Sequence, residues 1–270
     1  MISPTLASPR RTRTSWEIQR AVLFALIVRE LRTRVGPRWI GILWTLVEPL
    51  IQVLLMVAVF GSARSAGSPN LEFPVFLVSG MLPFFLFRSL AQRLTEAIDT
   101  NRALFSYRQV KPIDTVVARG LFEGVLWLSL SVMTLATLLW LGMDALPQKP
   151  LELFGVVLVA AGLGFGLGLL MAVVTHELPR VRSLVRMVYF PLYFCSGVLF
   201  SVSSIPQPYQ GWLLWNPLLH VVELARNAFS PAHALLPGVE VAYPASLALV
   251  LVTLALALYR RDRQKLLLGG

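Results

Sequence analysis

The chain has 270 residues, of which 56% are hydrophobic and 14% charged, and its formal net charge is +10. Soluble domains carry about 25% charged residues, so too few polar side chains are present here to cover a water-facing surface. The composition excludes an ordinary soluble protein, and the single cysteine, Cys195, excludes an intrachain disulfide framework and an all-cysteine metal site.

The first 39 residues are basic, and their centre has the pattern of a helix lying on a membrane surface. Residues 21–28 are apolar, a tryptophan lies on either side, and five arginines fall between positions 20 and 38. The apolar run is too short to span a bilayer, and Arg29-Glu30-Leu31-Arg32 follows it rather than a cleavage site. We expect residues 16–39 to form an amphipathic interface helix within a cytosolic N-terminal region, 1–39.

Six later segments approach the roughly 20 apolar residues that a helix needs to cross the hydrocarbon core. They are 40–61, 73–90, 116–143, 153–175, 184–202 and 241–259. Prolines weaken the second and fifth, but neighbouring helices can satisfy the backbone groups that a proline frees. We predict an all-α integral membrane protein with six transmembrane helices, a membrane domain over 40–260 and a cytosolic tail over 261–270.

The fourth predicted span carries alternating glycines with two Gly-x-x-x-Gly spacings. They are Gly162, Gly164, Gly166 and Gly168. Small residues let helix backbones approach closely, so we expect tight packing within the chain, with a contact between two copies as the alternative.

The distribution of Lys and Arg predicts the orientation. Eight lie in 1–39, six in 88–119, three in 180–186 and four in 260–265, which places 21 of the 24 on one side of the membrane. Only Arg64, Lys149 and Arg226 fall on the other side. The positive-inside rule then places both termini in the cytosol, and the basic pI needs no nucleic-acid partner.

Two connecting segments are unusual. Residues 91–114 form a polar cytosolic stretch that is longer than a turn and shorter than a domain. Residues 203–240 lie on the outer side yet include two short apolar pieces divided by Asn216-Pro217. Because these pieces cannot span a bilayer, we expect two periplasmic re-entrant half-helices in 203–240.

Ionisable residues in such a chain are candidate functional groups. Glu48 lies deep in the first span. Its role is either a contact in the channel or gate, or an acid that is paired at the interface between two copies. Glu123 is expected to pair with Arg119 or Arg88. His220, Glu223 and Arg226 share one helix face, where they could steer a substrate or satisfy one another. The three histidines lie far apart, so no metal site is expected.

No phosphate-binding loop is present, because none of the three lysines follows a glycine. Residues 26–34 (LIVRELRTR), 41–50 (GILWTLVEPL) and 215–226 (WNPLLHVVELAR) resemble the corresponding blocks of ABC-2 type transporter permeases, with a weaker match at Lys111-Pro112. Within that superfamily the chain is most similar to the KpsM-type capsular-polysaccharide exporters, over residues 26–260.

The resemblance implies a bacterial inner-membrane permease, not an enzyme, that works as a homodimer. Two cytosolic ABC ATPase subunits, which bind the ATP and magnesium, would dock below it. A periplasmic adaptor (polysaccharide co-polymerase) and an outer-membrane exporter would receive the product, a polysaccharide on a glycolipid anchor.

The resemblance and side-chain chemistry together suggest four groups of site residues. An arginine set would bind the lipid phosphate: Arg29, Arg32, Arg34 and Arg38. Channel or gate residues, with aromatic rings that stack on sugars, would be Trp44, Glu48, Phe84, Phe87, Arg88, Tyr189, Tyr193 and Trp215. The re-entrant segment would contribute Asn216, Pro217, His220, Glu223 and Arg226. ATPase coupling would use Asn101, Leu104, Phe105, Tyr107, Arg108 and Lys111.

Plainer interpretations compete with each group: arginines as topology signals, and aromatic residues as interface anchors. At the level of function the alternatives are an O-antigen or teichoic-acid type permease, a membrane-embedded transferase acting on lipid-linked sugars, and a proton-coupled carrier. The transferase would need a catalytic acid or base cluster, and the carrier usually shows internal repeats. The sequence shows neither feature.

Overall fold

The chain folds into helices. The structure is a computed structural model that describes residues 14–35, 71–107 and 109–268, with positions 47, 50, 51, 54, 55, 58 and 59 between the first two ranges. No β-strand occurs within these residues, so the all-α prediction is confirmed for this part of the chain. The predicted first span, 40–61, lies largely outside the described residues, and so do its Trp44 and Glu48.

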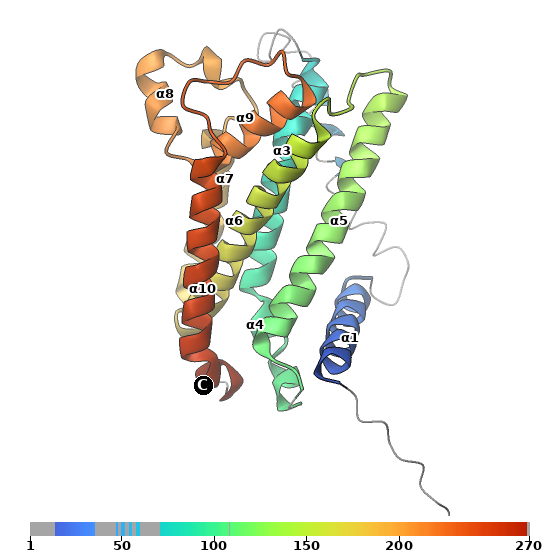
Figure 1. Cartoon of the computed structure of the whole chain (residues 1–270), viewed down its shortest axis with the longest axis vertical. Helices are drawn as coiled ribbons and strands as arrows, with labels where there is room; N and C mark the ends of the chain where they lie inside the picture. The colour runs from blue at the N-terminus through green and yellow to red at the C-terminus, as the bar shows by residue number, and fades with distance from the viewer. Residues whose placement is uncertain are drawn as a thin grey trace, which may run out of the picture.

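Four described helices are long and apolar enough to cross a membrane, and they run side by side in one bundle (Figure 1). They are α3 (Phe73–Thr95), α5 (Pro112–Trp140), α6 (Pro150–Glu177) and α10 (Ala242–Leu268). These helices match the second, third, fourth and sixth predicted spans. α10 continues well beyond the predicted limit at residue 259, so most of the predicted tail is helical.

The fifth predicted span differs from the structure at both ends. α7 (Pro179–Cys195) begins earlier than the predicted 184–202 and also ends earlier. Pro179 suits the first helical turn, where its missing N–H needs no partner. Beyond the helix, Gly197 has φ of +65°, a left-handed conformation that ends the regular backbone. With 17 residues, α7 is shorter than the roughly 20 usual for a spanning helix.

α6 packs its glycines against two different neighbours. A Cβ atom at Gly164 would lie 2.7 Å from the Phe87 carbonyl oxygen of α3. One at Gly166 would lie 2.8 Å from Leu251 Cβ of α10. Each Gly-x-x-x-Gly pair therefore admits one neighbouring helix, which confirms the expectation of tight packing within the chain.

Three short helices gather at one end of the bundle, here called the α8 end (Figure 1). They are η3 (Val202–Ser204), α8 (Gln207–Leu213) and α9 (Pro217–Phe229). Asn216 caps α9, because its side chain accepts a hydrogen bond from the Leu218 N–H at 3.0 Å. The segment 203–240 thus has short helices on either side of Asn216-Pro217, and their re-entry into the membrane stays a prediction.

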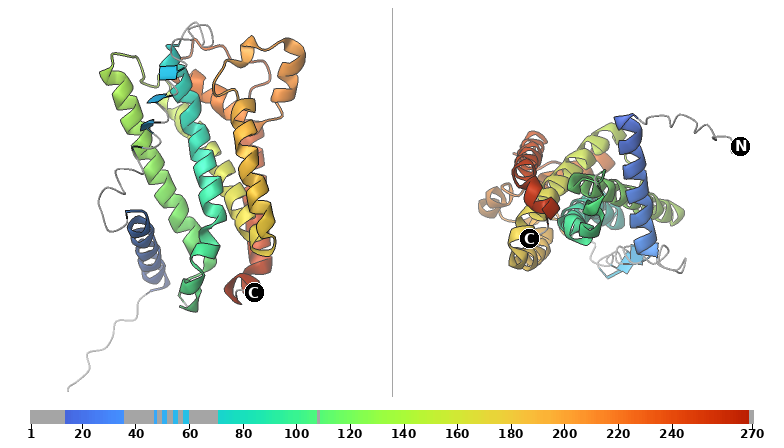
Figure 2. Two further views of the ribbon diagram at one scale, coloured as in Figure 1. Left: turned by 180° about the vertical axis from the view of Figure 1, so that it is seen from behind. Right: turned by 90° about the horizontal axis from the view of Figure 1, so that it is seen from below.

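The opposite end, here called the α1 end, holds α1 (Ser15–Val35), α4 (Ala97–Thr100), η2 (Arg102–Ser106) and the end of α10. Seen along the bundle axis, α1 lies across the bundle rather than along it (Figure 2, right). This direction is the one expected of a helix in the plane of a membrane surface.

Candidate functional site

α1 contacts the bundle through polar side chains and directs several apolar side chains outward. Gln19 donates a hydrogen bond to Asp114 of α5, and Arg29 donates one to Asn101, both at 2.7 Å. Phe24 and Leu31 are exposed. α1 is thus held to the protein by hydrogen bonds and charge, and it offers exposed apolar groups to its surroundings.

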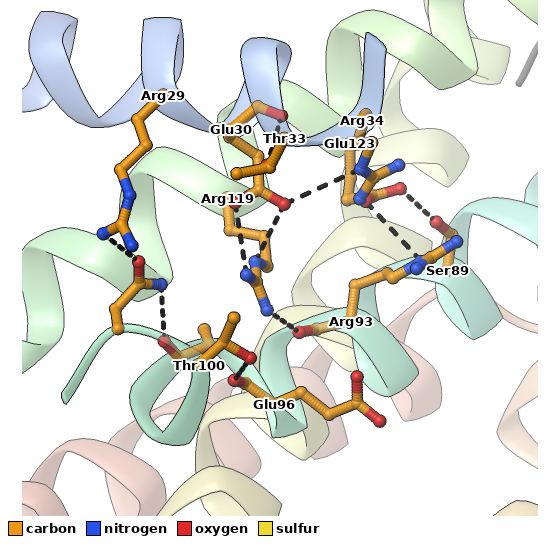
Figure 3. A network of polar contacts seen from close by, with 12 residues as sticks. Arg29, Glu30, Thr33, Arg34, Ser89, Arg93, Glu96, Thr100, Arg119 and Glu123 are labelled. Carbon is orange, nitrogen blue, oxygen red and sulfur yellow. Dashed lines mark hydrogen bonds and ion pairs between the residues drawn. The ribbon is translucent and has the colours of Figure 1, made fainter. Parts of the chain in front are cut away.

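A cluster of paired charges forms the centre of this contact (Figure 3). Glu30 of α1 lies between two guanidinium groups: its Oε1 is 3.6 Å from Arg34 Nε and 3.1 Å from Arg119 Nε. Glu123 of α5 binds Arg34 and accepts a hydrogen bond from the Ser89 hydroxyl of α3. The cluster joins α1, α3 and α5 through charged groups that are largely removed from solvent.

The Arg34 guanidinium keeps its charge in this setting. Burial lowers the pKa of Arg34 to about 10, and the positive charge of Arg93 acts in the same direction. This value is still well above neutral pH, so Arg34 is positively charged where it contacts Glu30 and Glu123. Because breaking such a pair leaves an uncompensated buried charge, the cluster fixes the position of α1.

These contacts account for two members of the arginine set predicted to bind a lipid phosphate. The guanidinium groups of Arg29 and Arg34 face protein oxygens. Arg32 is exposed on α1, and Arg38 lies outside the described residues. Glu123 was expected to pair with Arg119 or Arg88; its partners are instead Arg34 and Arg93, while Arg88 is exposed.

The predicted coupling residues are spread over the surface and the interior of the α1 end. Asn101 is buried and accepts a hydrogen bond from Arg29, so it connects the beginning of η2 to α1. Leu104 and Phe105 are half-buried, Tyr107 is 65% exposed and Lys111 is exposed. Arg108 lies outside the described residues. Tyr107, which directly follows η2, is therefore the most exposed apolar side chain among these predicted coupling residues that the structure describes.

Two cavities adjoin α1. A groove of about 490 Å³ separates its apolar side from the residues around η2, and its lining includes Val22, Ala25, Leu26, Leu104 and Val110. A smaller cavity of about 60 Å³ has a more polar lining that includes Arg29, Glu30, Asn101 and Arg119. Its size and polar partners suit ordered water.

A second ionic centre lies on α4. Asp99 Oδ1 accepts a hydrogen bond from Arg102 at 3.1 Å and lies 3.3 Å from His176 Nδ1 at the end of α6. Its other oxygen binds Arg182 of α7. Burial raises the pKa of Asp99, but the hydrogen bonds from Arg182 and His176 outweigh it and leave the pKa below the usual 3.8. Asp99 is ionised at neutral pH and links η2 to two other helices.

Four of the predicted channel aromatics come together between α3 and α7. Phe84 meets Tyr193 edge-on with ring centroids 5.0 Å apart, and Phe87 meets Tyr189 at 6.2 Å. Phe84, Phe87 and Tyr189 are buried in the chain. Trp215, by contrast, is 82% exposed at the α8 end. The four rings form an internal contact between helices, separate from Trp215.

The charged residues of α9 satisfy one another. Arg226 Nη1 donates to Glu223 at 2.9 Å, and the other Glu223 oxygen lies 2.9 Å from His233 Nε2. His220 Nδ1 accepts a hydrogen bond from the Glu240 N–H at 3.1 Å, and its Nε2 lies 2.9 Å from the Leu214 carbonyl oxygen. All three residues are buried: Glu223 and Arg226 pair with each other, whereas His220 bonds to backbone groups. A contact of this face with a substrate stays a prediction.

Sequence reasoning missed Glu30, Asp99, Glu96, Arg182 and Arg186 as partners. The i, i+4 spacing of Glu30 and Arg34 and the i, i+3 spacing of Asp99 and Arg102 were available as signals. The contact of Glu96 with Arg186 has no such signal, because 90 residues separate the two. No group of three His, Cys, Asp or Glu side chains that could hold a metal ion occurs in the described part of the chain.

Comparison with known proteins agrees with this architecture. The ABC-2 type transporter family matches residues 21–230. The chain is 38% identical to the polysialic acid transport protein KpsM of Escherichia coli, over 94% of this chain and 98% of that protein. It is 28% identical to the capsule polysaccharide export inner-membrane protein CtrC of Neisseria meningitidis, over 79% and 82% of the two chains. The O-antigen export system permease protein RfbA of Myxococcus xanthus is 29% identical over 69% and 70%.

The long apolar helices and the polar ends of the bundle define a multi-pass helical membrane protein. The chain belongs to the ABC-2 type transporter family. It is therefore a transport subunit rather than an enzyme, and this family membership implies an ABC ATPase partner.

Proposed function

We propose that this protein is the inner-membrane permease subunit of an ABC transporter that exports capsular polysaccharide. The observation that carries the proposal is the 38% identity to polysialic acid transport protein KpsM along almost the whole of both chains. The capsule export proteins of two other bacteria match less closely but over most of their length. An O-antigen permease also matches, over a smaller share of both chains.

The proposed topology has six transmembrane helices, with 40–61 and α7 joining the four long apolar helices. The α1 end and both termini face the cytosol, and the α8 end faces the periplasm, where α8 and α9 re-enter the outer leaflet. Two features support this orientation. The excess of Lys and Arg lies at the α1 end, and α1 lies across the bundle as a surface helix would (Figure 2).

The proposed assembly is a homodimer with two ATPase subunits, which bind ATP and magnesium. The ATPase would dock on η2 and on Tyr107, which directly follows it, because Tyr107 is exposed and the apolar residues of η2 are half-buried at the α1 end. A periplasmic adaptor and an outer-membrane exporter would continue the path beyond the α8 end. The substrate would be a polysaccharide on a glycolipid anchor, moving between the two copies.

The test is deletion of the gene in its own host, followed by expression of the protein from a plasmid. Deletion should remove capsular polysaccharide from the cell surface and leave it inside the cell, because polymer synthesis continues while export stops. Expression should restore the surface polymer. Unchanged surface capsule in the deletion strain would contradict the proposal, and loss of O-antigen with intact capsule would favour an O-antigen permease.

A further inference from the structure

α3 is buried along most of its length but has one uncovered face toward the α1 end. α5, α6, α7 and α9 pack around the helix. The residues that stay at least partly open recur at the spacing of successive helical turns, so they share one side of the helix. They are Phe85, Arg88, Ser89, Gln92 and Arg93. This set is here called the open face of α3, and all of its side chains except Phe85 are polar.

The open face lies between α7 and α5. At one edge the Phe85 ring stacks on Tyr193 of α7, with ring centroids 6.4 Å apart. At the other edge the Ser89 hydroxyl donates a hydrogen bond to Glu123 of α5. α3 runs between these two helices in the view from behind (Figure 2, left). A solute that moves along the bundle between α5 and α7 would therefore meet this face.

At the same depth, α5 exposes apolar side chains instead. Leu121 and Val125 lie on either side of Glu123, which bonds to Ser89, and both are more than 50% exposed. Side chains that face lipid hydrocarbon are apolar, because a charge is costly there. α5 thus has the surface of a lipid-facing helix, whereas the open face of α3 has the surface of a helix that faces water.

Arg88 is the charged group that lies deepest on the open face. It is exposed, and it forms no hydrogen bond or ion pair with any residue that the structure describes. Thr95, the last residue of α3, follows it by seven positions, which is about 10 Å of helix. Ionisable residues at such a depth typically line a water-filled cavity or the path of a charged solute.

The surroundings of the open face carry an excess of positive charge in the described part of the chain. The two nearby carboxylates are already paired, since Glu123 binds Arg34 and Glu30 binds Arg119 (Figure 3). Arg93 lies 4.0 Å from Glu123 and is 56% exposed. Arg93 and Arg88 therefore add positive charge that these carboxylates do not balance. A surface of this kind attracts negatively charged solutes.

We propose that the open face of α3 lines the path of the polymer and that Arg88 binds acid groups along it, so that the substrate is an acidic polysaccharide. This inference rests on the proposed function, which supplies a polysaccharide as the substrate. A guanidinium group forms two parallel hydrogen bonds with a carboxylate, which is the acid group of uronic and sialic acids. Such a contact depends on the charge of the polymer rather than on the order of its sugars.

The first measurement tests whether the open face meets water. It uses the complete complex with the ABC ATPase in nanodiscs, after Cys195→Ser removes the native thiol. Arg88→Cys places a thiol on the open face, and Leu121→Cys and Val125→Cys are the matched controls at the same depth. Methanethiosulfonates react with the thiolate in water, so the Arg88→Cys chain should react at least about tenfold faster than either control. Equal rates at the three positions would overturn the inference.

The second measurement tests the charge of the open face. Gln92→Cys places a thiol one turn from Arg88, and its rates with an anionic and a cationic methanethiosulfonate are each divided by the rate with mercaptoethanol. The ratio of the two cancels any change in the reactivity of the thiol itself. Arg88→Gln should lower the ratio of anionic to cationic reagent about fivefold, because a nearby positive charge is lost.

Two control variants accompany this measurement. Arg88→Lys retains the charge and should retain the ratio. Arg260→Gln removes an exposed arginine at the end of α10, away from the open face, and should also retain it. An unchanged ratio in Arg88→Gln would overturn the inference, and so would an equal fall in Arg260→Gln, because the effect would then reflect net charge alone.

Export in cells tests the substrate class. The surface polymer that the unaltered protein restores to a deletion strain is hydrolysed and its sugars are analysed, and acid groups are expected in it. Arg88→Gln should lower the amount of surface polymer about tenfold, as expected for loss of one charged hydrogen-bond donor, whereas Arg88→Lys should retain most of it. A neutral surface polymer, or full export by Arg88→Gln, would overturn the inference.

Failure of the proposed function has a different signature. Surface capsule that persists after deletion of the gene would defeat the proposed function itself. The two labelling measurements do not depend on export, so they would still show whether the open face of α3 meets water and attracts anions.

Discussion

At the scale of single residues, the structure places its strongest charge interactions where α1 meets the bundle. Glu123 is 4% exposed at its side chain, and Arg34 is 13% exposed. An ion pair with this burial contributes little net stability compared with an apolar pair, but removing one partner alone is costly. Its effect is to allow only one position for α1.

Replacing Glu123 by glutamine tests this interpretation. The variant should lower the free energy of unfolding by at most roughly 3–5 kcal/mol, because the largely buried Arg34 charge then keeps only Glu30, at 3.6 Å, as its partner. The measurement is unfolding in mixed micelles, followed by tryptophan fluorescence. The matched control is Glu152→Gln, which removes an exposed pair with Lys149 and should cost less than about 1 kcal/mol. Equal effects of the two variants would contradict the role given to Glu123.

The hydrogen-bond and ion-pair partners of the α1 arginines could not be predicted from the sequence. Arg29 and Arg34 were expected at a lipid phosphate, because both lie in a basic segment beside an apolar run. Their partners, Asn101 and Glu123, lie 72 and 89 residues away in sequence. Hydropathy and charge counts predict how a segment meets a membrane, but they carry no information on which distant side chain a guanidinium group will reach.

At the scale of elements, the glycines of α6 determine how closely this helix packs against its neighbours. Gly164 and Gly168 admit α3, whereas Gly162 and Gly166 admit α10. This part of the fold was predictable, because the spacing of small residues directly reports close helix contacts. The limits of α7 were less predictable, since the apolar sequence continues beyond Cys195 while the backbone turns at Gly197.

Adding one methyl group to α6 distinguishes glycines that lie against a neighbouring helix from glycines that do not. Gly164→Ala should destabilise the protein by about 1–3 kcal/mol, because the new Cβ would overlap the Phe87 carbonyl oxygen. Gly155→Ala is the control on the same helix, with nothing within 4 Å of the added Cβ. It should be neutral or stabilising by up to about 1 kcal/mol, since alanine favours helix. Thermal unfolding in detergent measures both, and equal midpoints would refute the packing argument.

η2 supplies a second test at this scale. Tyr107→Ala should reduce recovery of the ABC ATPase with the affinity-purified chain by about tenfold, as expected for loss of an aromatic anchor from an interface. The matched control is Trp140→Ala, an exposed aromatic residue at the opposite end, which should leave recovery unchanged. Normal recovery of the ATPase with the Tyr107 variant would remove η2 from the proposed docking surface.

At the scale of the whole molecule, the two ends of the bundle differ in charge as the sequence predicted. The ionic contacts of Asp99 and Glu30 lie at the α1 end, together with η2 and the basic end of α10. The α8 end exposes Trp212 and Trp215 instead. This asymmetry is the physical basis of the proposed orientation, because arginine-rich ends remain on the cytosolic side during insertion.

Cysteine labelling tests the orientation. In a Cys195→Ser background expressed without the ABC ATPase, Trp140→Cys should react with a membrane-impermeant maleimide in intact spheroplasts, whereas Tyr107→Cys should react only after permeabilisation. Both native side chains are well exposed, so access to the reagent depends on the side of the membrane. The reverse labelling pattern would show that the orientation is opposite to the proposed one. Labelling of both sites in intact spheroplasts would exclude a topology in which the two ends lie on opposite sides of the membrane.

The double glycine face of α6 limits how the bundle can open. Because α3 and α10 both approach the α6 backbone this closely, the three helices form a single slab. A passage wide enough for a polymer cannot be made by parting them. It must be made at the margins of the slab, where α5 with α1 lies on one side and α7 on the other. A survey of single substitutions should therefore find few tolerated changes within the slab and many at its margins.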